Sequence, residues 1–184
     1  LVAIEFGSQQ ASVRPSGSDY SLSNIRFKGN YTNRISAAQP HERLSLNGVE
    51  ARLQGQPLRM DVVMENFAQP TLSLSAKSRI DLEVLSRFYL PDTLESMTGS
   101  LLVDARINGR AGDPAGWVSQ GTVEAAHVTL KLKESPVMVE DINGRLTLFG
   151  NRLTVTQLSG KAAGSDFNVD GTFDNVYAWL LSDK

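Results

Sequence analysis

The chain has 184 residues, of which 41% are hydrophobic, so it is long enough for one domain with a sizeable core. Its formal net charge is −2 with acidic and basic residues interspersed, which argues against the basic stripe that a nucleic-acid backbone requires. It contains no cysteine, which excludes disulfide bonds, zinc–thiolate sites and thiol chemistry.

Apolar and polar residues alternate along most of the chain, and a side-chain period of two gives a strand one apolar and one polar face. Gly, Pro, Asn and Ser cluster between these segments, as turns require. The predicted strands are Leu1–Phe6, Tyr20–Tyr31, Arg43–Leu53, Leu58–Glu65, Thr71–Leu82, Ser100–Asn108, Gly121–Lys133, Val137–Leu148, Leu153–Ser159 and Asp166–Phe173.

Two segments have helical spacing instead. Asp81–Leu90 is followed by Pro91, and Asp174–Leu181 lies near the end of the sequence. Each begins with an aspartate suited to an N-cap or first-turn position, so we expect two short helices.

Three predicted connections follow from turn-forming residues. Gly150 and Asn151 tolerate the positive φ of a hairpin turn and predict a reversal there. Ala111–Gly116 is the best loop between longer segments, and Ser16–Asp19 and Ser36–Pro40 are also predicted loops.

The order of these segments repeats loosely. Leu46-Asn47-Gly48 begins a series of strands that ends in the first helix, and Ile142-Asn143-Gly144 begins a similar series 96 residues later. Such a repeat is typical of an array that grows by adding sheet to sheet. We therefore expect one β-rich unit over residues 1–184, with diverged modules at 1–98 and 99–184.

One segment resembles a calcium-binding loop. Asp166–Gly171 reads D-x-N-x-D-G, but an EF-hand loop needs a bidentate acid at its twelfth position, where this chain has Tyr177. Phe167 and Val169 suit a strand better than a loop. The segment is therefore interpreted as an ordinary strand with a polar face, and no metal site is predicted.

No catalytic motif stands out. Gly160-Lys161 lacks the other residues of a phosphate-binding loop, and His41 and His127 have no second histidine at metal-binding spacing. No G-x-S-x-G motif is present. The following carboxylates are spread over different segments, and nothing local singles out a catalytic pair among them: Asp61, Glu65, Asp81, Glu83 and Asp104. We predict no catalytic residue and no cofactor.

A run of structural motifs covers Gly121–Thr172. In order, it contains GTVE, HVTL, SPV, VEDINGRLT, LTV, LSGKAAGS and VDGT. Over these roughly 50 residues the chain resembles the AsmA-like family of bacterial envelope proteins, which includes the TamB-like and YhdP-like members. The preceding region fits only as a diverged copy.

This resemblance implies an all-β fold, an elongated and mostly antiparallel sheet curved into a U-shaped groove, often called a β-taco. Periodicity alone leaves an open sandwich as the alternative. Full-length members of the family have an inner-membrane helix and a periplasmic body, and they are implicated in phospholipid transport to the outer membrane and in envelope integrity. The resemblance therefore implies a periplasmic location in a Gram-negative bacterium. The sequence opens at Leu1 in a strand-like run, so we expect a longer parent protein that carries the membrane anchor.

The predicted function is to shield lipid acyl chains in an apolar β-groove. Exposing about 15 methylene groups to water costs on the order of 12 kcal/mol, so a lipid crosses an aqueous compartment only with its tails covered. Twelve residues on alternating positions are predicted to line the groove: Leu101, Val103, Ile107, Val128, Leu130, Ile142, Leu146, Leu148, Leu153, Val155, Phe167 and Val169.

Two other readings stay open. The apolar face of the sheet can instead close into a dry core, which would make the chain a non-catalytic structural or interaction module of an outer-membrane assembly factor. An enzyme would require distant acids or serines to converge in one pocket. The expected partners are phospholipid or another acyl lipid, a membrane reached through other parts of the parent protein, and no nucleic acid. Unpaired edge strands also predict an edge-to-edge homodimer.

Overall fold

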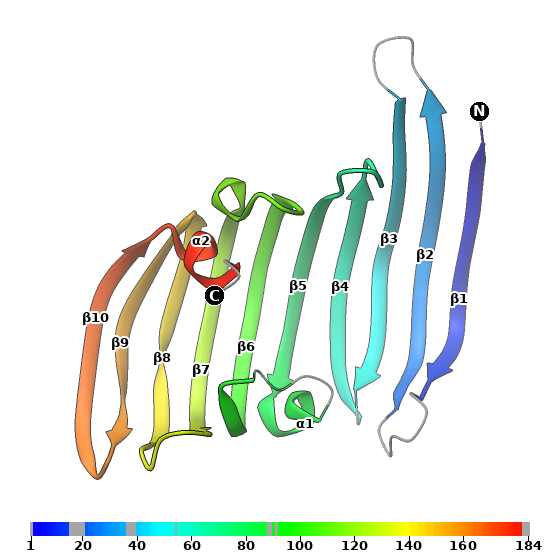
Figure 1. Ribbon diagram of the computed structural model, residues 1–184. Coiled ribbons are helices and arrows are strands. Elements are labelled where there is room, and N and C mark those ends of the chain that lie inside the picture. The colour runs from blue at the N-terminus through cyan, green and yellow to red at the C-terminus, as the bar shows by residue number, and fades with distance from the viewer. Residues whose placement is uncertain are drawn as a thin grey trace.

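The computed structural model describes residues 2–14, 21–35, 40–53, 55–87, 90 and 92–181. It shows a single antiparallel sheet of ten strands, arranged in the order in which they occur in the sequence (Figure 1). The sheet does not close, so β1 and β10 are its edges. The structure therefore confirms the predicted all-β fold with two short α-helices, and it has one curved sheet rather than a sandwich.

All ten predicted strands are found, most of them longer than predicted, because bulges interrupt the alternation on which the predictions rest. The strands are β1 (Ala3–Val13), β2 (Leu22–Ile35), β3 (Pro40–Leu53), β4 (Gln56–Glu65), β5 (Thr71–Asp81), β6 (Leu94–Arg110), β7 (Val118–Leu132), β8 (Met138–Gly150), β9 (Arg152–Ala162) and β10 (Ser165–Asp174). The helices are α1 (Leu82–Ser86), the 3₁₀-helix η1 (Pro114–Gly116) and α2 (Val176–Leu181).

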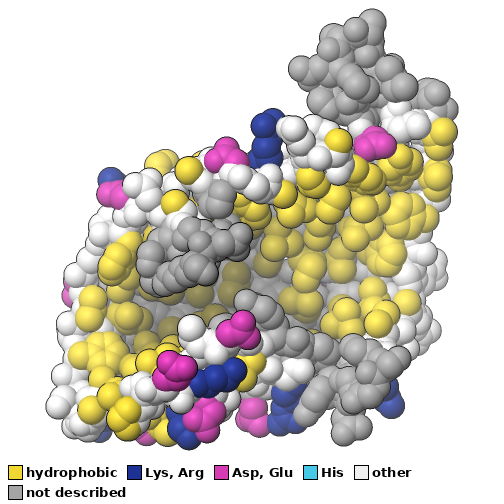
Figure 2. Space-filling view, viewed as in Figure 1, with side chains coloured by type: hydrophobic (Ala, Val, Ile, Leu, Met, Phe, Trp, Pro, Cys, Tyr) yellow, Lys and Arg dark blue, Asp and Glu magenta, His cyan; other side chains and the backbone are white. Residues whose placement is uncertain are grey.

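Bulges curve the sheet. Seven of the nine strand pairs contain a shift in register, and only β4–β5 and β5–β6 are unbroken along their described length. A bulge bends its strand and increases the local twist. It also moves the apolar positions by one residue, so that Val155 and Leu158 of β9 keep facing the same side of the sheet. The result is a trough whose hollow face is visible in Figure 2.

Side-chain oxygens on the convex face hold three of these bulges. The backbone N–H of Gly48 donates to Asp61 Oδ1 at 2.6 Å, and that of Gln157 donates to Asp170 Oδ1 at 2.8 Å. The N–H of His127 donates to Asn143 Oδ1 at 2.9 Å. All three donor residues have positive φ, between 49° and 57°. In each case the acceptor comes from the next strand, which fixes the bulge across the pair.

Replacing Asp170 by alanine should destabilise the chain by about 1 kcal/mol, because the bulge amide of Gln157 loses its acceptor. Asp170→Asn is the matched control, because the amide oxygen of Asn143 accepts a hydrogen bond of the same kind from the backbone N–H of His127 at another bulge. Urea unfolding followed by circular dichroism measures both variants. Equal midpoints for the alanine and asparagine variants would contradict this role of the side chain.

The first helix begins as predicted. Asp81 Oδ1 accepts a hydrogen bond from the backbone N–H of Val84 at 3.2 Å, which caps α1. Leu82 of α1 packs against Met97 and Val128 in a small buried cluster on the concave face. The predicted helix over Asp81–Leu90 is shorter in the structure, with α1 ending at Ser86, and residues 88, 89 and 91 lie outside the described residues.

The prediction that Asp174 starts the second helix is wrong. Asp174 is the last residue of β10, and its carboxylate pairs with Arg152 of β9 at 2.7 Å. Asn151 caps α2 instead, since its Oδ1 accepts from the N–H of Tyr177 at 3.1 Å and its carbonyl accepts from Val176 at 3.4 Å. The capping residue comes from another turn of the sheet, so local spacing in α2 does not reveal it.

The predicted turn at Gly150 and Asn151 is confirmed, with Phe149 and Arg152 paired on either side of it and φ of 62° at Gly150. Ala111–Gly116 connects β6 to β7, also as predicted. The predicted loop at Ser16–Asp19 lies outside the described residues, and of Ser36–Pro40 only Pro40, the first residue of β3, is described. The order β3–β4–β5–α1 recurs as β8–β9–β10–α2. The division into modules at 1–98 and 99–184 stays a prediction.

Candidate functional site

The concave face is apolar from one edge of the sheet to the other (Figure 2). Antiparallel partners in register point to the same side, so the strand pairings define rows of side chains across the trough. One row runs from β3 to β10: Val49, Met60, Ala76, Ala105, Gly121, Leu148, Leu153 and Phe173. Another runs from β1 to β6: Phe6, Gly29, Leu46, Val62, Leu74 and Ile107. We call this concave surface the groove.

The groove is largely uncovered. The chain has a solvent-accessible surface of 12081 Å², whereas a compact monomer of this size exposes about 8,700 Å². Few hydrophobic side chains are buried, and no described side chain is less than 2% exposed. Leu74, in the middle of the groove, is 37% exposed. The sheet therefore presents its apolar face to solvent instead of enclosing it.

All twelve residues that the sequence predicts as groove lining lie on the concave face, as their pairings require. They differ in how far the protein itself covers them. Val128 and Val155 are each 5% exposed. Val128 belongs to the buried cluster to which α1 contributes Leu82. Three further predicted residues pack against this cluster: Leu101, Leu130 and Ile142. The groove is thus partly closed near α1 and at Val155, and it is open at Leu74.

Sequence reasoning missed the lining from the N-terminal half of the chain. These residues lie on the same concave face: Ile4, Phe6, Phe27, Tyr31, Leu44, Leu46, Val62, Met64, Leu72 and Leu74. The alternation that reveals them was visible in the predicted strands. The predicted lining begins only at Leu101, although the same alternation is present in these earlier strands.

The polar side chains of the groove are already hydrogen-bonded to the sheet. The hydroxyl groups of Ser8, Ser78 and Ser119 donate to backbone carbonyls at 3.0, 3.3 and 3.2 Å. Among the residues that the structure describes, no buried side-chain nitrogen or oxygen lacks a partner. The groove therefore offers a ligand apolar contact and few free polar groups, which suits a hydrocarbon better than a polar substrate.

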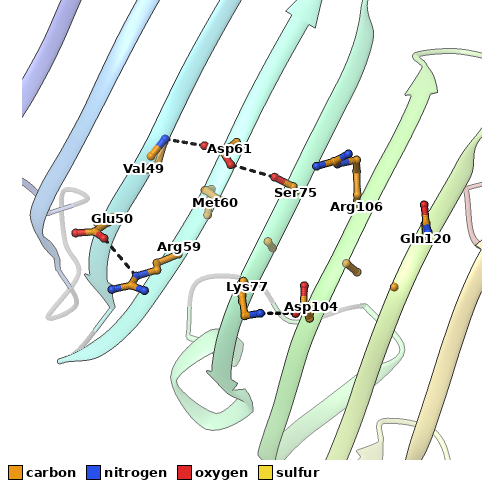
Figure 3. A pocket seen from close by; sticks show the side chains of 14 residues that line it. Val49, Glu50, Arg59, Met60, Asp61, Ser75, Lys77, Asp104, Arg106 and Gln120 are labelled. Carbon is orange, nitrogen blue, oxygen red and sulfur yellow. Dashed lines mark hydrogen bonds and ion pairs between the residues drawn. The ribbon is translucent and has the colours of Figure 1, made fainter.

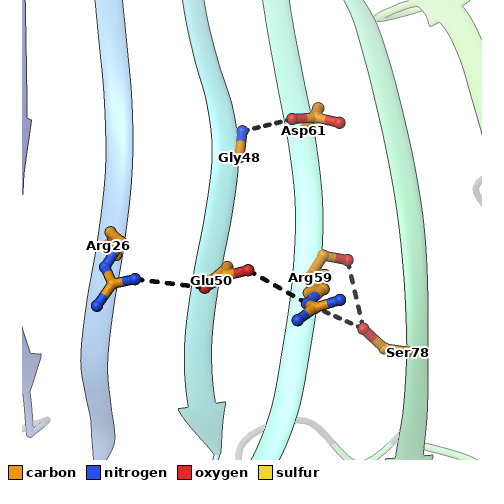
Figure 4. A network of polar contacts seen from close by, with 6 residues as sticks. All are labelled: Arg26, Gly48, Glu50, Arg59, Asp61 and Ser78. Carbon is orange, nitrogen blue, oxygen red and sulfur yellow. Dashed lines mark hydrogen bonds and ion pairs between the residues drawn. The ribbon is translucent and has the colours of Figure 1, made fainter.

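The convex face is charged, and several of its acidic and basic side chains form ion pairs with one another. Glu50 of β3 lies between Arg59 at 3.3 Å and Arg26 at 3.9 Å, which links three adjacent strands (Figure 4). Lys77 and Asp104 pair at 2.7 Å beside a shallow depression on the same face (Figure 3). Exposed pairs of this kind contribute little to stability. They keep this side of the sheet soluble while the other side stays apolar.

The carboxylates considered as catalytic candidates each have a structural partner. Asp61 caps the bulge at Gly48 and Asp81 caps α1. The remaining three form ion pairs: Glu65 with Arg43 at 3.2 Å, Glu83 with Arg87 at 2.8 Å and Asp104 with Lys77 at 2.7 Å. The structure does not bring these five side chains together in one pocket.

The segment that resembles a calcium loop, Asp166–Gly171, is part of β10, as the strand interpretation predicted. Gly160-Lys161 lies within β9. In the described part of the chain, no three His, Asp or Glu residues gather as a metal site would require. Similarly, no described helix has the length and apolar character needed to span a membrane.

His127 takes part in an exposed polar cluster beside its bulge. Its Nδ1 lies 2.6 Å from Asp141 Oδ1, and Asn143 Nδ2 donates to the same carboxylate at 3.0 Å. The hydrogen bond with His127, followed by that with Asn143, holds the pKa of Asp141 below its ordinary value. The carboxylate therefore stays charged to a lower pH than an ordinary aspartate, and it links β7 and β8 across the bulge.

Comparison with known proteins gives no match, since no family model, curated protein or solved structure matches the chain.

Proposed function

We propose that the chain is a non-catalytic lipid-binding segment whose groove covers the acyl chains of a phospholipid. The observation that carries this proposal is the continuous apolar concave face over ten strands, most of which no other part of the described chain covers. Soluble proteins rarely leave a large apolar surface exposed unless it binds something. The hydrogen-bonded serines of the groove favour a ligand that has no polar groups where it makes contact.

The dimensions of the groove suit acyl chains. Neighbouring strands are about 4.8 Å apart, so ten strands give a groove about 43 Å long from edge to edge. An acyl tail spans half of a hydrocarbon core about 30 Å thick, or about 15 Å. The groove thus has room for whole tails, while a polar head group can remain in water outside it.

The resemblance of Gly121–Thr172 to AsmA-like proteins supports a cellular setting for this activity. In the proposed setting the parent protein is anchored in the inner membrane of a Gram-negative bacterium, and this segment lies in the periplasm. There the groove would keep lipid tails covered on the way to the outer membrane. Shielding needs no reaction, which agrees with carboxylates that serve as caps and ion-pair partners.

The test compares a charge inside the groove with a charge on the opposite face. Leu74→Asp places a carboxylate in the groove, where an acyl chain would have to desolvate it at a cost of about 3 kcal/mol. The affinity for phospholipid should fall by roughly a hundredfold. This loss is measured as the amount of phospholipid that is extracted from the purified protein and counted by mass spectrometry. Leu102→Asp is the matched control, because Leu102 is a 49% exposed leucine on the convex face of the adjacent strand.

The control variant should retain as much lipid as the unmodified chain. Lipid-free unmodified protein, or equal lipid content in both variants, would contradict the proposal. A lipid-free dimer that buries the concave face would support the interaction module instead.

A further inference from the structure

The two lips of the trough differ in chemistry. On the lip near α2, each described connection carries a large apolar side chain that faces solvent. Phe67 lies between β4 and β5, Val118 follows η1, and Phe149 precedes the β8–β9 turn, with Phe173 near the end of β10. These side chains are 39%, 48%, 73% and 51% exposed, respectively. Together with Trp117 they form what we call the aromatic lip.

The opposite lip has no exposed aromatic side chain among the described residues, and the exposed large apolar side chains at its strand ends are Val13, Leu132 and Met138. The β9–β10 turn contains Ala163 and Gly164, and the β7–β8 connection contains Lys133 and Glu134. Helix α1 on this side carries the Glu83–Arg87 ion pair. In contrast, the sequence of α2 is VYAWLL, without a charged residue. The two lips therefore differ in aromatic content, in addition to the difference in polarity between the two faces of the sheet.

The spacing of the aromatic lip favours a bilayer over a protein partner. Successive connections on one lip are two strands apart, or about 10 Å. Protein interfaces concentrate their binding energy in a central cluster of packed side chains, which isolated tips do not provide. In a bilayer each tip is solvated separately by lipid, so each contributes by its own buried area. Phe149 is 73% exposed and lies neither in the groove nor at a sheet edge. Its exposure is therefore not explained by lipid binding in the groove or by strand pairing at an edge.

The aromatic lip is continuous with the groove. The ring of Phe67 lies 6.0 Å from that of Tyr31, a groove residue, and the ring of Trp117 lies 6.2 Å from that of Tyr177. Trp117 also covers Gly109 on the concave face, and its Nε1–H donates to the Arg110 carbonyl at 2.8 Å. Its indole therefore presents only apolar surface.

The ion pairs at this end of the sheet lie on the convex side. They are Arg43–Glu65 and Arg152–Asp174, whose positions alternate with the groove residues of their strands. Phe149 lies on this convex side too, because it pairs with Arg152. Phe67, which packs on Tyr31, and Phe173, which faces the groove, lie on the concave side of these ion pairs.

We propose that the aromatic lip docks on the surface of a lipid bilayer, and that acyl chains pass over it into the groove. The passage of acyl chains into the groove rests on the proposed function, whereas the docking on a bilayer does not. Because the ion pairs Arg43–Glu65 and Arg152–Asp174 neutralise charge at this lip, docking depends on apolar insertion and not on anionic lipid.

Flotation with phosphatidylcholine vesicles tests the docking. The full chain should float with the vesicles, and the triple variant Phe67→Ser/Val118→Ser/Phe149→Ser, which spares the groove residue Phe173, should lose at least about tenfold in partitioning. The matched control Leu102→Ser/Leu132→Ser/Met138→Ser removes exposed apolar side chains from the convex face and the opposite lip. It should partition within about twofold of the unmodified chain. All six side chains are exposed, so circular dichroism should show both variants folded.

Three results would overturn the docking. The first is the absence of the unmodified chain from the vesicle fraction, and the second is an equal loss of partitioning in the control and the aromatic variant. The third is release of the protein when NaCl is raised from about 0.1 M to about 1 M, as electrostatic binding requires. Two variants distinguish a failure of docking from a failure of lipid binding in the groove. Leu74→Asp should float normally while losing its lipid, and the aromatic variant should lose flotation while lipid already in its groove remains.

Discussion

Gly121→Ala is expected to destabilise the chain by about 3 kcal/mol, one of the largest effects of any single methyl group in it. Gly121 lies in β7 with φ of 140°, which L side chains rarely adopt. A Cβ there would lie 2.2 Å from the Asp104 carbonyl oxygen and 2.5 Å from the Ala105 Cα. Both are backbone atoms of β6, so the two strands would have to separate. Urea unfolding followed by circular dichroism measures the loss.

Gly171→Ala is the matched control for this prediction. Gly171 also lies in a strand on the concave face, but its nearest potential neighbour is a Phe173 ring carbon at 3.9 Å. Its substitution should change the free energy of unfolding by less than about 1 kcal/mol. Equal unfolding midpoints for the two alanine variants would show that β6 and β7 tolerate a wider spacing at Gly121.

Val128→Asp should be similarly damaging, by about 4 kcal/mol, for an electrostatic reason. Val128 is 5% exposed and packs with Leu82 of α1 and Met97 of β6. A carboxylate buried there has no partner in the cluster, so its pKa in the folded chain rises. The group is easier to protonate when folded than when unfolded, and the penalty therefore shrinks as pH falls towards 5.

Val118→Asp provides the control, since Val118 is 48% exposed at the start of β7. It should unfold close to the unmodified chain at both pH values. Unfolding experiments at pH 7 and pH 5 separate the two variants. A penalty for Val128→Asp that does not change with pH would mean that the small core reorganises and hydrates the new charge.

The period-two pattern was sufficient to predict ten strands and their apolar face, because each strand pairs with its neighbours in sequence. It was insufficient for the strand ends. Val155 and Leu158 are three positions apart, an odd spacing that breaks simple alternation, yet they lie on one face because a bulge intervenes. The bulge has two signals in the sequence. One is this odd spacing, and the other is Asp170, a carboxylate 13 residues after Gln157 that accepts the hydrogen bond of the bulge amide.

Features that depend on distant residues were beyond local sequence reasoning. Asn151 caps α2 from a turn 26 residues before Tyr177, so nothing within the helix identifies its first residue. The aromatic lip brings together Phe67, Phe149 and Phe173, which are scattered through the sequence and lie at the same end of an antiparallel sheet. Their common position follows from counting strands, once all ten are known.

The strictly sequential order of the sheet also has a consequence for how such a protein changes in evolution. Every strand depends on its two sequence neighbours alone, so inserting or deleting one hairpin leaves the register of all the other pairs intact. Each hairpin lengthens the trough by about 10 Å without altering its cross-section. Length is therefore a freely adjustable property of this architecture, while the width of the passage is conserved by the bulges within each strand. Pairing between sequence neighbours also keeps contacts local, which favours folding by successive addition of hairpins over a single closure event.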